Sequence, residues 1–161
     1  MTQPPLSHAP MDSPIGRLWV TVSPRGLLSI SRGDLPDPGP AALDPPAVAP
    51  VIAELAAYFA GRLRRFTVPL DLDDAAPFDA AAWRAAGRIP YGETVSYGEL
   101  AGMAGSPRAA QAAGGAMARC PLSPVVPCHR VIHADGSIGG WGRDPWVKRW
   151  LLDLEREATI G

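Results

Sequence analysis

The chain has 161 residues, of which 47% are hydrophobic and 19% are charged, and its formal net charge at pH 7 is −1. This length suits one ordinary domain or two small ones. No apolar run approaches the ~20 residues that a membrane-spanning helix needs, and the first residues lack the pattern of a secretory signal. The small net charge excludes nucleic-acid binding that depends on a large basic field. We therefore expect a cytoplasmic protein with no membrane partner.

The first predicted element is a β-hairpin over Ile15 to Ile30. Leu18, Val20 and Val22 alternate on one face before a turn at residues 23–26, whose sequence is Ser-Pro-Arg-Gly. A strand pair with one apolar face needs a cover.

A helix from Val48 to Gly61 is predicted to supply that cover, because its apolar side chains recur at helical spacing. Residues 35–50 contain six prolines, which sustain neither a strand ladder nor a helix, so a surface loop is predicted there. A further strand is predicted from Thr67 to Leu72, followed by a linker. These elements form a predicted N-terminal α/β domain over residues 1–76.

Helices are predicted to dominate a second domain over residues 77–161. The first of them runs from Phe78 to Arg88. Ser96 is predicted to cap the next, over Tyr97 to Met103, with Glu99 at its third position completing a capping box.

Ser106 is predicted to cap a third helix, with Pro107 at its first position and an end near Ala118. The short turn before it contains Gly105, so the pair predicts a helix-turn-helix. The third helix is rich in alanine and glycine, which lets it approach a nucleic-acid groove or pack tightly against another helix. The last predicted helix spans Pro145 to Glu157 and is expected to bury Trp146, Val147, Trp150, Leu151 and Leu154.

The segment Pro127-Cys128-His129-Arg130-Val131 carries the clearest chemistry. A free thiol with a pKa near ~8.5 is mostly protonated at neutral pH, and a neighbouring base or cation raises the thiolate fraction. His129 is such a base, and Arg130 adds positive charge that favours the anion. A nucleophilic Cys128 is therefore one interpretation.

Three other interpretations of the cysteines remain open on these residues. A lone buried cysteine is often an inert small hydrophobe. Cys120, Cys128, His129 and His133 have the residue types of a zinc site, but adjacent Cys128 and His129 point apart in an extended segment, which argues against metal. A structural disulfide between Cys120 and Cys128 is disfavoured, because nothing marks the chain as secreted.

Taken together, the segments resemble the O6-alkylguanine-DNA alkyltransferases, also called methylated-DNA–protein-cysteine methyltransferases. The resemblance rests on residues 12–16, 89–97, 114–117, 127–131 and 147–152. It implies a fold class of α/β plus mostly α: an RNase H-like N-terminal domain and a winged-helix-like C-terminal domain. Such proteins enter the minor groove of DNA and flip the damaged base into a pocket, where a sulfur has access to the alkyl carbon.

The same resemblance implies an enzyme of which each protein molecule reacts only once, because the thioether formed on Cys128 is a poor leaving group. His129 would take the thiol proton through a water, Glu155 would orient the imidazole, and Tyr97 would hydrogen-bond the flipped base. Implied substrate contacts are Val131, Trp141, Gly142 and Met117. Implied DNA contacts are Arg108, Gln111, Ala112 and Gly114. No metal or cofactor is implied, and the expected partner of the monomer is alkylated double-stranded DNA.

Two positions depart from the family pattern. Gln111 stands where the family usually has an arginine that fills the hole left by the flipped base, and Cys120 stands where it usually has an asparagine that ties the active-site turn together. O4-alkylthymine is a weaker expected substrate. The alternatives are a non-enzymatic lesion reader, which would not need Cys128, an alkyltransferase with a changed substrate, and a winged-helix regulator.

Overall fold

The structure is a computed structural model and describes residues 5–34, 38–139 and 144–160. The chain divides into two compact units, Met1–Asp74 and Ala75–Gly161, and each is described by itself. Two of the expected substrate contacts, Trp141 and Gly142, lie outside the described residues. Within the described ranges, no helix is long and apolar enough to cross a bilayer.

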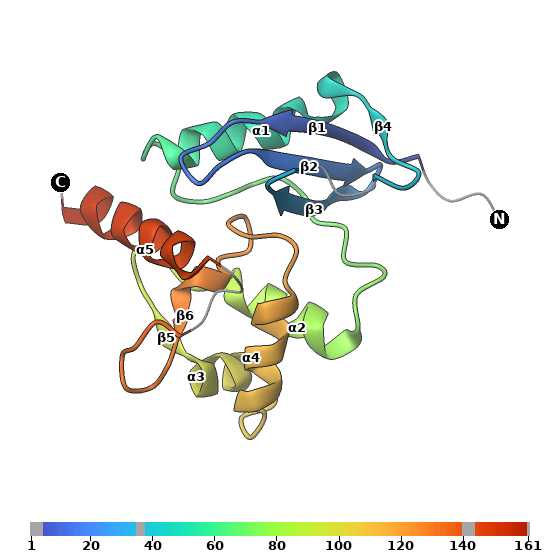
Figure 1. Cartoon of the computed structure of the whole chain (residues 1–161). Helices are drawn as coiled ribbons and strands as arrows, with labels where there is room; N and C mark the ends of the chain where they lie inside the picture. Colours follow the sequence, from blue (N-terminus) through green and yellow to red (C-terminus); the bar gives the residue numbers. More distant parts are fainter. Residues whose placement is uncertain (1–4, 35–37, 140–143, 161) are drawn as a thin grey trace. The chain divides into compact units, whose positions relative to one another are not determined.

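The N-terminal unit contains a four-stranded sheet in the order β3-β2-β1-β4 (Figure 1). β1 (Ser7–Met11) pairs antiparallel with β2 (Leu18–Ser23), and β2 pairs antiparallel with β3 (Gly26–Arg32). β4 (Ala42–Leu43) runs parallel to β1. The predicted hairpin is confirmed as β2 and β3. The sequence did not reveal β1 and β4, because one contains a proline and little apolar alternation and the other has only two residues.

One face of this sheet is covered by α1 (Pro45–Phe59), as Figure 1 shows. The predicted alternation holds, since Leu18, Val20 and Val22 are buried while the residues between them are half-buried. The helix contributes Val48, Val51, Leu55, Tyr58 and Phe59 to the same core. The core of this unit is therefore almost wholly apolar.

Two expectations for this unit are wrong in part. α1 already begins at Pro45, so the proline-rich loop does not extend to residue 50. Prolines at the first two helical positions replace amides that would have no helical partner, which is why the helix tolerates them. The predicted strand from Thr67 to Leu72 is reduced to one bridge between Leu70 and Leu27, because Pro69 has no amide to donate to a longer ladder.

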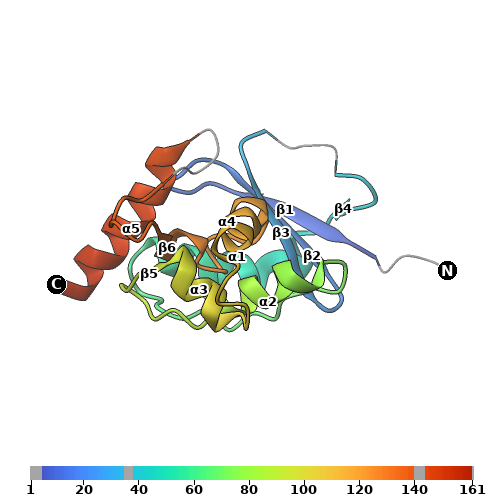
Figure 2. The ribbon, with the colours of Figure 1, turned by 90° about the horizontal axis from the view of Figure 1, so that it is seen from below.

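The C-terminal unit is a helical cluster around a short parallel strand pair. Helices α2, α3 and α4 pack on one another, and α5 lies against η1 beside the strands (Figures 1 and 2). Its elements are α2 (Pro77–Ala86), β5 (Val95–Ser96), α3 (Tyr97–Met103), α4 (Ala110–Arg119), η1 (Cys128–Arg130), β6 (Val131–Ile132) and α5 (Pro145–Ile160).

The helix-turn-helix is confirmed as α3 and α4, but its second helix starts later than predicted. The Ser96–Glu99 capping box is present, with distances of 3.0 and 3.1 Å. Ser106 does not cap α4; its carbonyl accepts the Ala109 amide in a turn, and the helix begins at Ala110. Ser106 and Pro107, whose sequence is typical of a helix start, therefore lie in the turn between the two helices.

Helix α5 differs from expectation in what it buries. Val147 and Leu151 are buried as predicted, but Trp146 is 48% exposed, and Trp150 and Leu154 are only half-buried. Instead, Lys148 and Glu155 are each 1% exposed. The face that α5 turns to the interior therefore carries charge, and this face leads to the candidate site.

Candidate active site

Cys128 opens the short helical turn η1 and is 2% exposed. Its amide donates to the Val126 carbonyl at 2.8 Å. Pro127, which precedes the sulfur, has a fixed φ of −81°. The Cys128 side chain thus lies on an interior turn that backbone hydrogen bonds hold in place.

A buried hydrogen-bonded trio includes the two residues that follow this cysteine in the chain. His129 Nε2 lies 2.5 Å from Glu155 Oε2. Arg130 donates to both oxygens of the same carboxylate, Nε to Oε1 at 2.8 Å and Nη2 to Oε2 at 3.0 Å. All three side chains are less than 10% exposed. One carboxylate of α5 therefore fixes both the imidazole and the guanidinium that follow Cys128 in the chain.

The protonation of His129 follows from these contacts. Burial lowers the pKa of His129, and its hydrogen bond with Glu155 only partly opposes this. Burial alone would raise the pKa of Glu155, but hydrogen bonds from His129 and Arg130 hold it well below its usual range. A carboxylate can only accept, so Nε2 carries the proton of the neutral imidazole. Nδ1 is then the basic nitrogen, and it can receive a proton.

Arg130 does not act as the sequence suggests. It was expected to favour the Cys128 thiolate, but its guanidinium is engaged by Glu155 and by the Ile89 carbonyl, to which Nη1 donates at 2.6 Å. The cation whose charge lowers the pKa of the thiol is Lys148. The expectation for Arg130 is therefore wrong, and Lys148 takes its place.

Lys148 is a buried cation at the centre of the site. Its Nζ donates to the Val131 carbonyl at 2.7 Å and to the Tyr97 hydroxyl at 3.4 Å, and it lies 5.6 Å from the centroid of the Tyr97 ring. Burial lowers the pKa of Lys148 to about 8, although attraction to Cys128 opposes the shift. The ammonium is held where it can interact with a developing thiolate.

Tyr97 reaches the site through the strand pair. β5 and β6 run parallel with Val95 opposite Val131 and Ser96 opposite Ile132, so Tyr97, the first residue of α3, follows the pair on the side of His133. The Tyr97 ring lies 5.2 Å from the His133 ring, centroid to centroid. Burial, and then the nearby Cys128, raise the pKa of Tyr97. Tyr97 is therefore a neutral phenol at physiological pH and can donate a hydrogen bond.

The second cysteine is in contact with the first. The side chains of Cys120 and Cys128 share a hydrogen bond, and this bond together with the larger effect of burial raises the pKa of the Cys128 thiol well above its ordinary value. Cys128 is consequently a thiol in the resting protein. The candidates for a base and a cation that would favour its thiolate are His129 and Lys148.

The residues expected to contact DNA are divided between surface and interior. Gln111 and Ala112 are exposed in the first turn of α4, and Arg108 is exposed in the turn before it. Gly114 is half-buried, and a Cβ on it would lie 3.8 Å from Tyr97 Cδ1. Met117, an expected substrate contact, is 9% exposed. The surface-facing set is therefore the turn and the start of α4.

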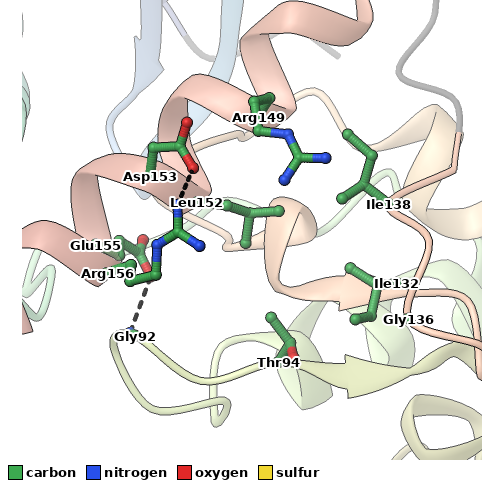
Figure 3. A pocket seen from close by; sticks show the side chains of 10 residues that line it. All are labelled: Gly92, Thr94, Ile132, Gly136, Ile138, Arg149, Leu152, Asp153, Glu155 and Arg156. Atoms are coloured by element: carbon green, nitrogen blue, oxygen red, sulfur yellow. Dashed lines mark hydrogen bonds and ion pairs between the residues drawn. The ribbon is translucent and has the colours of Figure 1, made fainter.

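A pocket of about 220 Å³ lies beside Glu155, between α5 and the loops that flank β5 and β6. Figure 3 shows Arg149 and Arg156 extending into it from α5, with Arg156 paired to Asp153 and the Gly92 amide bonded to Glu155. Among the expected site residues that the structure describes, only Glu155 lines it. Cys128, Tyr97 and Met117 do not, so this pocket is not where the expected substrate contacts meet.

The sequence reasoning missed one residue of the site, although a signal was present. Lys148 is the single lysine beside fourteen arginines, and it stands between Val147 and Leu151 on an apolar helical face. A lone cation at such a position has to find partners inside the fold. In the described ranges, no cluster of three or more His, Cys, Asp or Glu side chains is placed to hold a metal ion.

Comparison with protein-family models matches both halves of the chain. Residues 6–72 match the ribonuclease-like domain of 6-O-methylguanine DNA methyltransferase. Residues 77–157 match the DNA binding domain of the same protein. The expected fold class, an RNase H-like domain followed by a helix-turn-helix domain, is confirmed.

Individual relatives agree with these matches. A methylated-DNA–protein-cysteine methyltransferase of Mycolicibacterium paratuberculosis is 42% identical over 96% of this chain and 94% of its own length. The crystal structure of Mycobacterium tuberculosis OGT in complex with DNA is 40% identical, with a TM-score of 0.87 over 94% of each chain. A DNA base-flipping protein of Thermus thermophilus is 40% identical over 90% of this chain and 97% of its own.

Proposed function

The chain belongs to the 6-O-methylguanine DNA methyltransferase family, and on that premise we propose that Cys128 accepts the alkyl group of O6-alkylguanine in double-stranded DNA. The activity is direct reversal of the damage by a methylated-DNA–protein-cysteine methyltransferase. The observation that carries the assignment is the buried Cys128 followed by a His129 that is bonded to Glu155 at 2.5 Å. O4-alkylthymine is a weaker substrate of the same reaction.

The thiol must lose its proton before it can attack. In the proposed route, a water carries the Cys128 proton to Nδ1 of His129, while Glu155 holds Nε2–H and stabilises the imidazolium that forms. The sulfur then attacks the alkyl carbon as the bond from that carbon to O6 breaks. The electron pair of that bond leaves with the guanine. Because the product is a thioether, the protein reacts once.

Lys148 and Tyr97 are proposed to stabilise the charges that appear in this step. The ammonium of Lys148 is close enough to Cys128 to attract its thiolate once the thiol has lost its proton. Tyr97 keeps its proton and can donate it in a hydrogen bond to the departing base. Preorganised charge in a buried site acts more strongly than it would in water.

The DNA-facing surface is proposed to be the start of α4. Gln111 is exposed there, where it can hydrogen-bond the base left unpaired after flipping, but it lacks the charge and the stacking plane of a guanidinium. The phosphate contact is assigned to Arg108. We expect the protein to act as a monomer in the cytoplasm, where its DNA substrate is present.

Exchanging Gln111 for arginine should strengthen lesion binding. We predict that Gln111→Arg lowers the Kd for a duplex with O6-methylguanine by roughly three- to tenfold, about 1 kcal/mol. Gln111→Lys is the matched control, since it adds the charge without the planar fork and should gain less. Titration of a labelled duplex at fixed salt measures both. An unchanged Kd in Gln111→Arg would contradict the assigned position of this residue.

A second candidate function is that of a non-enzymatic lesion reader, which we consider because the relative from Thermus thermophilus is a DNA base-flipping protein. A reader would need the pocket and the DNA surface, but not a thiol with a base behind it. The buried trio of His129, Arg130 and Glu155 favours alkyl transfer, because it holds a base in the residue next to the thiol, a feature that lesion reading does not use.

The test uses the whole chain and an oligonucleotide duplex that contains O6-methylguanine. Cleavage after Arg119 and Arg130 releases the peptide 120–130, which contains both cysteines, so fragmentation within that peptide is needed to locate the methyl group. We expect one methyl group on Cys128 and none in Cys128→Ala. Tight lesion binding without an adduct would favour the lesion reader over the proposed alkyl transfer. The absence of both binding and adduct would indicate a changed substrate.

A further inference from the structure

The two thiols of this chain form a pair that the alkyl-transfer reaction does not require. Cys120 follows the last residue of α4, and its side chain is hydrogen-bonded to that of Cys128. Both cysteines are free, and Cys120 is half-buried whereas Cys128 is buried. A small solute can therefore reach the first thiol more easily than the second.

The segment between the two cysteines keeps them together. Residues 121–127 include three prolines, and Leu122 and Val126 are each at most 1% exposed. The Val126 amide donates to the Leu122 carbonyl at 2.9 Å, and the Cys128 amide donates to Val126 at 2.8 Å. The thiols are thus held in contact by a short, anchored loop, so linking them requires little loss of chain entropy.

We propose that Cys120 and Cys128 are a redox modification site, at which a hydroperoxide joins the two thiols in a disulfide that reversibly withdraws the alkyl acceptor. The sequence alone disfavoured a structural disulfide. The pair is reduced in the structure, and the link is formed only when an oxidant is supplied.

The chemistry takes place in two steps. The sulfur of Cys120 attacks the peroxide, its S–H is replaced by S–OH, the O–O bond breaks, and one water (or alcohol) leaves. The sulfur of Cys128 then attacks the sulfenyl sulfur, the S–S bond forms, and the hydroxyl departs as water with the Cys128 proton, for which His129 is the nearby base. Two thiols lose two electrons in total, and the peroxide gains them. A dithiol reverses the link by exchange.

The proposed link has a functional consequence that rests on the proposed role of Cys128 as acceptor. A disulfide removes the nucleophile, and it also keeps the sulfur from reaching the sulfinic state, which a dithiol does not reverse. An asparagine at position 120, as expected for the family, cannot provide this protection.

The first arm of the test contains no DNA. The full chain is treated with hydrogen peroxide, the remaining thiols are blocked with iodoacetamide, and the peptide 120–130 is examined by mass spectrometry. We expect this peptide to lack two hydrogens and to carry no blocking group, and dithiothreitol to reverse both. Sulfinic acid on Cys128 beside a free Cys120, or links only between molecules, would overturn the proposal.

The second arm compares methyl transfer before and after peroxide in each protein, so that any change in basal rate cancels. The whole chain should lose at least tenfold in transfer and recover it with dithiothreitol, whereas Cys120→Ser should show no recoverable loss. Cys120→Ala serves if the serine variant does not fold. The same recoverable loss in these variants would overturn the proposal. If Cys128 were not the acceptor, the link in the first arm would still form, which separates the two failures.

Discussion

The two units of this protein build their interiors in opposite ways. The N-terminal unit buries an apolar sheet face under α1, and its buried polar side chains are only His8 and Ser23 among the residues described there. The C-terminal unit, in its described part, buries His129, Arg130, Lys148 and Glu155 within a similar length of chain. One interior is assembled by hydrophobic burial, and the other contains a charged cluster beside the Cys128 thiol.

The difference indicates what the buried charges are for. Replacing a buried ion pair by apolar residues of similar volume is often neutral or stabilising, whereas removing one partner is strongly destabilising. The N-terminal unit shows that this chain can form a core without such groups. We therefore propose that the charged cluster serves the chemistry of Cys128, as the source of a base and a cation.

The largest effect, on the free energy of unfolding, is expected from breaking the buried ion pair between Arg130 and Glu155. Arg130→Met leaves the buried Glu155 carboxylate without its guanidinium, so the free energy of unfolding of the C-terminal unit should fall by about 3–5 kcal/mol. Urea denaturation measures it.

The matched control is Arg119→Met in the same unit. Arg119 also grips a carboxylate with two donors, to Asp79 at 2.8 and 3.1 Å, but its side chain is 59% exposed. Little change is expected there, because water and ions screen an exposed pair. If Arg130→Met and Arg119→Met lost equal free energies of unfolding, burial would not explain the difference expected between the two ion pairs.

A slightly smaller effect is expected in the apolar unit. Leu55 is fully buried in α1, and Leu55→Ala should cost about 2–4 kcal/mol through lost burial and the cavity left behind. Below the temperature at which the variant unfolds, methyl transfer per folded molecule should stay within twofold of the unmodified chain. A large drop in transfer with the fold intact would contradict the division of roles between the units.

A smaller difference between the two units is expected in their loss of stability at low pH. Glu155 has a lowered pKa, so its stabilising contribution is fully present above its ordinary value of 4.5 and is lost as the pH falls below it. His129 also has a lowered pKa, so its neutral buried form is favoured above 6.5 and loses advantage below that pH. Both signs predict earlier acid destabilisation of the C-terminal unit. Amide exchange at pH 7 and pH 4 should show protection falling first in α5, and less so in Glu155→Gln. Earlier loss in α1 would contradict this.

Much of this architecture could be predicted from the sequence, where local patterns were strong. The alternation of Leu18, Val20 and Val22 located the hairpin, and Ser96 with Glu99 located the start of α3. The predictions failed where tertiary partners decide. Ala42 and Leu43 become a strand only because β1 lies beside them, and Ser106 precedes a turn although its sequence favours a cap.

The site shows the same limit. The Cys-His pair was identified from the residues themselves and the role of Glu155 through resemblance to a family, but the partner of Arg130 depends on where α5 lies, 25 residues further along the chain. Lys148 reads as an ordinary cation until its exposure of 1% is known. Helix caps and strand alternation can be predicted from the local sequence. The partner of a buried charge depends on how distant segments pack in the fold.

Lys148→Met tests most directly whether buried charge serves the thiol. The change removes a cation whose lowered pKa shows that the fold disfavours its charge, so the free energy of unfolding at pH 7 should change little. The single-turnover rate of methyl transfer from an O6-methylguanine duplex to Cys128 should fall ten- to hundredfold at pH 7, the loss of one charge-assisted interaction. The ratio of the two rates should shrink as the pH rises past about 8, where the unmodified lysine loses its charge. An unchanged rate at pH 7 in a folded Lys148→Met would contradict the account.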